Sequence, residues 1–144
     1  MNDRQINFKN KKILIYGFGI SGISCFNFLK NKNECKIFDD NKKNISIKFR
    51  KKIININKLL NTIFDFIVLS PGIDIKKCKI SDYLKKNRSK IVTELDIFEL
   101  SYPKINKITI TGTNGKSTTS KLLYEVLKRN KMDVRLTGNI GYPI

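Results

Sequence analysis

Short apolar runs of strand length recur along the chain, and most of them end in a glycine or a polar turn. They cover residues 12–16, 35–38, 66–69 and 90–92. β-Branched and aromatic residues are common in these runs, as in strands that are buried on both faces. Because helical patterns alternate with the runs, their order predicts an α/β fold with a parallel sheet.

The segments between the runs carry apolar residues at helical spacing. A helix is expected from about Ile23, a second over residues 79–87, and a third over residues 93–100. Thr93 can cap the third helix, with Asp96 three residues later. Before the third strand the pattern is weaker, and it predicts a short helix and then a strand at residues 53–56.

The helical pattern breaks at Ser101-Tyr102-Pro103, because proline disfavours a helical conformation in the residue before it. Beyond the break, Ile108 and Ile110 predict a strand, residues 117–129 a helix, and residues 133–136 a second strand. We therefore expect two domains, residues 1–102 and 103–144.

The turn after the first run reads Gly17-Phe18-Gly19-Ile20-Ser21-Gly22, the G-x-G-x-x-G pattern between a strand and a helix. In that context the pattern predicts a nucleotide whose diphosphate lies at the start of the helix. The second run ends in Asp39-Asp40, about 20 residues after the glycines, where an acidic side chain binds the ribose in this pattern. The third ends in the turn Ser70-Pro71-Gly72-Ile73, at the sheet edge where ligands bind. Alone, this set fits NAD or FAD equally well.

A second glycine-rich loop follows the strand expected at residues 108–110. It consists of Gly112, Thr113, Asn114, Gly115, Lys116, Ser117 and Thr118. Such a loop predicts a phosphate cradle for ATP, with Lys116 on the β- and γ-phosphates and the Ser117 hydroxyl on Mg²⁺. It departs from G-x-x-x-x-G-K-[ST], because Ile110 stands where that pattern has its first glycine.

Composition narrows the possible functions. The formal net charge is +17, but the lysines are spread along all 144 residues, so we expect no specific nucleic-acid binding. No apolar run approaches the roughly 20 residues that cross a bilayer, so we expect no membrane association and a cytoplasmic protein. The absence of histidine excludes a histidine general base or zinc ligand in the chain, and an oxygen-held metal favours Mg²⁺.

Four motifs in order resemble the Mur ligases, above all those that add D-glutamate in peptidoglycan synthesis. They are G-F-G-I-S-G, S-P-G-I, T-G-T-N-G-K-S-T and G-N-I-G, and the resemblance runs from about Lys12 to Ile144. It implies a Rossmann-like parallel-sheet domain that holds a UDP-sugar, then the start of a P-loop-type α/β domain that holds Mg-ATP. The family's third domain, which brings the amino acid, has no counterpart in the 144 residues.

The resemblance also implies roles for single residues. Lys116 would be catalytic, with ATP on residues 112–118 and Mg²⁺ on Ser117. The implied reaction is ATP-dependent amide formation, in which the substrate carboxylate becomes an acyl phosphate and the amine of D-glutamate displaces phosphate. Asn41 and Lys42 stand where relatives often carry an arginine, a departure near the uridine. The positions implied for UDP-N-acetylmuramoyl-L-alanine are Ile20, Ser21, Asp39, Asp40, Ser70, Pro71, Gly72 and Asn139.

The chain thus resembles the amino-terminal part of a ligase. We expect a monomer that binds the UDP-sugar weakly and phosphates at the second loop, without turnover. Three alternatives stay open: a noncatalytic nucleotide-binding fragment, a Mur ligase that adds L-alanine or a diamino acid, and an NAD-linked oxidoreductase. The last leaves the loop at residues 112–118 unexplained.

Overall fold

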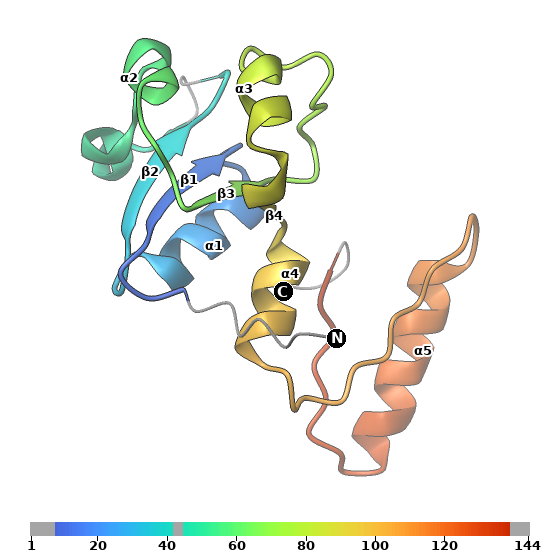
Figure 1. The fold of residues 1–144 in the computed structure, drawn as a ribbon. Coiled ribbons are helices and arrows are strands. Elements are labelled where there is room, and N and C mark those ends of the chain that lie inside the picture. The colour runs from blue at the N-terminus through green and yellow to red at the C-terminus, as the bar shows by residue number, and fades with distance from the viewer. Residues whose placement is uncertain (1–7, 42–44, 139–144) are drawn as a thin grey trace. The chain divides into compact units, whose positions relative to one another are not determined.

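The computed structural model describes residues 8–41 and 45–138, and its internal contacts divide the chain into two units, Met1–Ser101 and Tyr102–Ile144. Each unit is described by itself. The first unit alternates strands and helices, as the sequence predicts (Figure 1). Its elements are β1 (Lys12–Tyr16), α1 (Ile20–Leu29), β2 (Glu34–Phe38), the 3-10 helix η2 (Ile47–Lys52), α2 (Ile56–Leu60), β3 (Phe66–Leu69), α3 (Ser81–Lys86), the 3-10 helix η3 (Arg88–Lys90), β4 (Ile91–Val92) and α4 (Glu94–Ser101).

The four strands form one sheet in the order β2-β1-β3-β4, and every pairing is parallel. A fifth segment lies alongside β2 at the border of the sheet, where Ile53 forms an isolated parallel bridge with Ile37. There the Ile54 amide donates to the Ile37 carbonyl at 2.9 Å. With that segment included, the order of the segments along the sheet is the doubly wound order of a Rossmann fold. The predicted Rossmann-like α/β fold is therefore confirmed.

The strand predicted at residues 53–56 is wrong beyond Ile53. Asn55 ends the extended segment, because its side chain accepts the Lys58 amide at 2.8 Å and caps α2, which begins at Ile56. An asparagine that satisfies an exposed helical amide favours a helix start over a continued strand.

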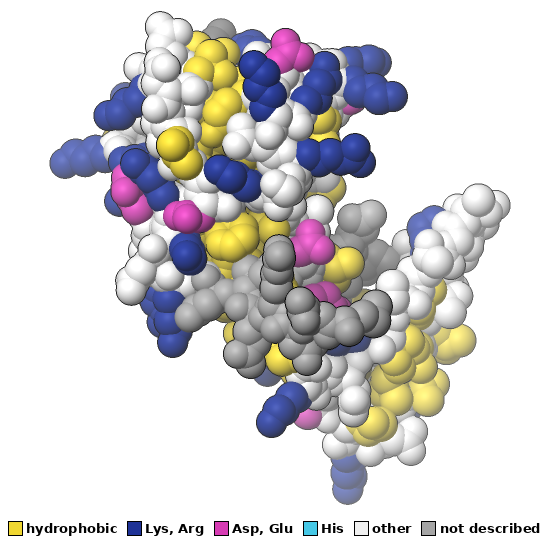
Figure 2. Space-filling view, viewed as in Figure 1, with side chains coloured by type: hydrophobic (Ala, Val, Ile, Leu, Met, Phe, Trp, Pro, Cys, Tyr) yellow, Lys and Arg dark blue, Asp and Glu magenta, His cyan; other side chains and the backbone are white. Residues whose placement is uncertain are grey.

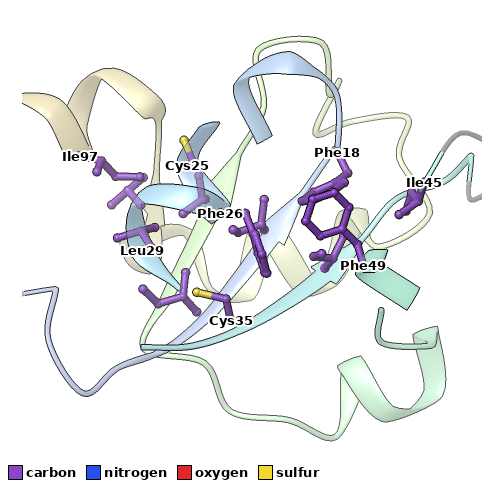
Figure 3. Packing of buried hydrophobic residues seen from close by; sticks show 13 residues of the cluster. Phe18, Cys25, Phe26, Leu29, Cys35, Ile45, Phe49 and Ile97 are labelled. Atoms are coloured by element: carbon purple, nitrogen blue, oxygen red, sulfur yellow. The ribbon is translucent and has the colours of Figure 1, made fainter. Parts of the chain in front are cut away.

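The sheet has an apolar core on each face. Ile13 and Ile15 of β1 point to the face that α1, α4 and η2 cover, and Leu14 and Tyr16 point to the face that α2 and α3 cover. This alternation is the period of two that a strand imposes on its side chains. Figure 3 shows the first core, where the rings of Phe18, Phe26 and Phe49 meet edge to face with centroids 4.9–5.7 Å apart.

The third predicted helix is present as α4, with the predicted cap. The Thr93 amide and hydroxyl each donate to Asp96 Oδ2 at 2.7 Å, and the Asp96 amide donates back to Thr93 Oγ1 at 3.2 Å. This reciprocal pair is a capping box with aspartate in the glutamate position. It fixes where the chain leaves β4 and enters α4.

In the second unit, α5 (Lys116–Arg129) is the helix predicted after the glycine-rich loop. The strands predicted at residues 108–110 and 133–136 are wrong, since neither segment forms a strand in the structure. A strand forms only where a neighbour takes up its backbone hydrogen bonds, and hydrophobic character alone does not supply that neighbour. Within residues 102–138 no side chain is buried, and Ile108 is 67% exposed.

Basic side chains are spread over the face of the first unit that Figure 2 shows. Figure 2 shows lysine and arginine side chains scattered over the visible face, with few acidic ones between them. The described residues include no helix that is long and apolar enough to span a bilayer.

Candidate functional site at the carboxyl edge of the sheet

Three loops leave the sheet of the first unit at the same level. Tyr16 is in register with Phe38 on one side and with Leu69 on the other, so Gly17, Asp39 and Ser70 are the next residues of three adjacent strands. From β1 the chain passes first to β2 and later to β3 on the opposite side. This edge is therefore a topological switch point, the place where open α/β sheets bind their ligands.

The glycine turn after β1 is packed tightly against itself. Gly17 has a φ of +87°, which favours glycine, and a Cβ on Gly22 would lie 2.0 Å from the Gly17 carbonyl oxygen. The Ser70 hydroxyl donates to that same oxygen at 2.8 Å, so the loop after β3 fixes the loop after β1. Two of the three glycines are thus explained by internal packing.

Gly19 has a different environment. A Cβ there would meet no atom within 4 Å, and its φ of −81° suits any residue, so neither packing nor backbone geometry requires glycine. Gly19 is the N-cap of α1, and no side chain caps this helix. A glycine followed by an uncapped helix start allows an anion to approach the backbone amides closely.

Two predicted substrate residues lie in the first turn of α1, beside Gly19. Ile20 is 77% exposed, and Ser21 is half-buried. Both therefore lie at the helix start, where the sequence predicts the ligand.

The two aspartates that follow β2 have distinct partners within the protein. Asp39 accepts the Phe18 amide on Oδ2 at 2.6 Å and the Asn41 amide on Oδ1 at 2.7 Å, which ties the end of β2 to the glycine turn. Asp40 accepts the Tyr16 hydroxyl on Oδ2 at 2.8 Å, while its enclosed Oδ1 has no hydrogen-bond partner among the residues that the structure describes. Burial, reinforced by Asp40, raises the pKa of Tyr16 far above its ordinary value, so this hydroxyl remains a donor.

The predicted turn after β3 lies at the same edge. Pro71 and Gly72 are exposed, and the Ile73 amide closes the turn by donating to the Ser70 carbonyl at 3.1 Å. The structure thus brings together seven of the predicted substrate residues. Their direct contacts with a substrate stay a prediction. These residues are Ile20, Ser21, Asp39, Asp40, Ser70, Pro71 and Gly72.

Sequence reasoning missed two residues at this edge. Tyr16 holds Asp40, and a polar-tipped residue directly before the glycine turn could have indicated this role. Lys79 donates from Nζ to the main-chain oxygen of Asp40 at 3.2 Å. Nothing in the pattern of the sequence distinguishes Lys79 from the other lysines near it.

In the second unit the glycine-rich loop folds onto its own lysine. Lys116 Nζ donates to the carbonyls of Gly112 and Thr113, and Gly115, with a φ of +77°, is the N-cap of α5. Gly112 has a φ of +151°, so both glycines are in backbone conformations that side chains disfavour. No side chain caps α5, and its start remains open to an anion.

The other predicted ATP residues, Thr113, Asn114, Ser117 and Thr118, are exposed in the loop and in the first turn of α5. Asn139, predicted to contact the substrate, lies outside the described residues. Within residues 8–41 and 45–138, no three acidic, cysteine or histidine side chains gather as a metal site.

The family comparison and the sequence relatives agree on one group. Residues 11–92 match the family described as Mur ligase MurD-like, N-terminal domain. Relatives named UDP-N-acetylmuramoylalanine--D-glutamate ligase include one from Buchnera aphidicola subsp. Schizaphis graminum, 36% identical over 96% of this chain, and one from Rickettsia prowazekii, 35% identical over 94%. The chain spans about a third of the length of these relatives, 32% and 31% respectively.

A similar solved structure is a UDP-D-quinovosamine 4-dehydrogenase from Vibrio fischeri. It is 24% identical, with a TM-score of 0.45 over 67% of this chain and 88% of that one.

Proposed function

Because the chain belongs to the Mur ligase MurD-like N-terminal domain family, we propose that the sheet edge of its first unit binds the UDP part of UDP-N-acetylmuramoyl-L-alanine. The observation that carries this proposal is Gly19. Neither packing nor backbone conformation requires a glycine at this position. The residue lies at the uncapped start of α1, at the topological switch point of the sheet. A diphosphate is the ligand group that this combination suits.

The parts of the nucleotide would be divided among the three loops. The diphosphate would accept hydrogen bonds from the backbone amides at the start of α1, near Gly19 and Ser21, where the helix dipole also favours negative charge. The ribose would lie near Asp39, whose oxygens keep lone pairs beyond the two amides that they accept. The exposed turn at Pro71 and Gly72 would pack against the uridine.

We further propose that residues 103–144 begin an ATP-binding domain and that residues 1–102 form the UDP-sugar domain. The loop at Gly112 and Gly115 fits a phosphate group, because a Cβ at either position is disfavoured by the backbone and α5 begins uncapped. Mg-ATP, when bound, would supply the phosphoryl group that activates a carboxylate. Lys116 would leave the carbonyls of its own loop to offset phosphate charge, and Ser117 would hold Mg²⁺ through its hydroxyl.

The complete reaction proposed is the joining of D-glutamate to UDP-N-acetylmuramoyl-L-alanine, as the relatives' name indicates. The chain covers about a third of those relatives, so we propose that the 144 residues bind ligands without turnover. Phosphate release with both substrates and Mg-ATP should stay at the level without protein. Turnover by these residues alone would contradict this part of the proposal.

Calorimetric titration of the 144-residue chain tests the nucleotide site. UDP should bind and raise the melting temperature of the first unit, since a ligand that binds only the folded state stabilises it. NADH should do neither. Binding of NADH in preference to UDP would favour the oxidoreductase alternative, and binding of neither would remove the proposal.

A further inference from the structure

The segment between β3 and α3 is irregular but firmly held. The amides of Lys77 and Cys78 donate to the Asp74 carbonyl at 3.1 and 3.0 Å, so the segment is built from successive turns. Ile73, Ile75 and Cys78 pack against the core under α2 and α3, and Ile80 is only 2% exposed. Residue 79 therefore lies between two anchored neighbours.

This anchoring places a cation at the candidate site. Lys79 itself is exposed, and its Nζ donates to the main-chain oxygen of Asp40, two residues after the end of β2, at 3.2 Å. An ammonium group carries three donors, and this contact uses one of them. The ammonium thus lies at the sheet edge with donors left for a ligand.

Two fixed carboxylates lie at the same edge of the sheet. Asp40 is held by Tyr16, and Asp39 is held by the Phe18 amide at 2.6 Å, one residue before Gly19. A diphosphate that approaches Gly19 comes close to the Asp39 carboxylate and is repelled by it at short range. The dipole of α1 offsets part of this repulsion, but a full positive charge nearby offsets more.

We propose that Lys79 is a nucleotide-binding residue, whose ammonium pairs with the diphosphate of the bound nucleotide and offsets Asp39 and Asp40. The inference rests on the proposed function and adds to it a determinant that discriminates nucleoside diphosphates from nucleosides. The contact with Asp40 is the resting position of the side chain. Its preorganisation lowers the entropy cost of the ligand contact.

The test compares UDP with uridine in titrations of the 144-residue chain. In Lys79→Met the dissociation constant for UDP should rise roughly tenfold, the value of one charge-assisted hydrogen bond, while that for uridine changes by less than about twofold. Lys79→Arg should bind UDP like the wild type. The difference between wild type and Lys79→Met should shrink in high salt, since screening weakens exposed charge pairs.

Lys32→Met is the matched control. Lys32 is exposed and lies between α1 and β2, at the opposite edge of the sheet, so this variant removes the same charge away from the site. It should leave the UDP affinity unchanged, and a loss as large as in Lys79→Met would overturn the inference in favour of a net-charge effect.

Two other results would overturn this inference and leave the proposed function standing. One is unchanged UDP affinity in Lys79→Met. The other is an equal loss for UDP and uridine with a lower melting temperature, which would make Lys79 a structural clamp on Asp40. If the wild type fails to bind UDP, the proposed function fails and the inference falls with it.

Discussion

Replacing Gly22 by alanine tests the geometry on which the site depends. The new Cβ would lie 2.0 Å from the Gly17 oxygen, well inside the roughly 3.3 Å at which carbon and oxygen normally meet. That oxygen cannot easily move, because the Ser70 hydroxyl donates a hydrogen bond to it at 2.8 Å. The Gly17 amide is also fixed, since it donates to the Phe38 carbonyl at 3.0 Å. The loop and α1 must therefore separate.

The expected cost is about 3 kcal/mol, at the upper end for overpacking, of which alanine recovers up to about 1 kcal/mol through its higher helix propensity. For a unit of this size, each kcal/mol shifts the melting temperature by about 4–8 °C. Thermal unfolding followed by circular dichroism should thus show a fall of roughly 8 °C or more in Gly22→Ala.

Gly19→Ala is the matched control for this prediction. Nothing lies within 4 Å of its Cβ, so the folded state should lose no more than about 1 kcal/mol, the usual difference between glycine and alanine at an N-cap. Its UDP affinity should nevertheless fall, because the methyl group occupies the approach to the amides of α1. If Gly22→Ala melts within about 2 °C of the wild type, the tight packing of the turn is refuted.

Three further predictions concern stability. Ser70→Ala should lose about 1–2 kcal/mol in urea unfolding, because it leaves the Gly17 oxygen without its hydroxyl donor; an unchanged midpoint would mean that this bond contributes nothing. Thr93→Ala should lose about 1 kcal/mol through the capping box, and Thr93→Ser, which keeps the hydroxyl, should lose less. Burial, and after it Glu94, raises the pKa of Cys25 to about 12, and burial raises that of Cys35 to about 11, against an ordinary value of 9.0. Because both folded thiols hold their protons more tightly than the unfolded ones, their contribution is complete below pH 9.0 and is lost as the pH rises from 9.0 towards 11 and 12. The free energy of unfolding should therefore fall across this range, and a Cys25→Ala, Cys35→Ala double variant should show a shallower fall.

Local patterns in the sequence were sufficient for most of the first unit. The buried strands, the glycine turn and the cap at Thr93 and Asp96 depend on residues close together in the chain. The parallel order follows from the alternation of strands and helices. The sequence therefore predicted that the three loops of the candidate site meet at one edge of the sheet.

The finer structure of that edge depends on distant partners. Ser70 meets Gly17 across 53 positions, and Asp39 meets Phe18 across 21, so no local pattern reveals these bonds. Lys79 is placed by its apolar neighbours, which look like ordinary core residues in the sequence. The strand predicted from Ile108 and Ile110 failed for a related reason, since strand formation depends on a partner that a single run cannot specify.

The short outer strands of the sheet affect how the molecules behave toward one another in concentrated solution. At one border, β4 has only two residues. At the other border, β2 pairs on its outer side with Ile53 through an isolated bridge. The 3-10 helix η2, which carries four basic side chains, lies against β2. Long, flat, uncharged borders invite a strand from another molecule, whereas short and lysine-rich ones discourage it. We therefore expect this chain to resist cross-β aggregation through its sheet, even when it is expressed at high levels.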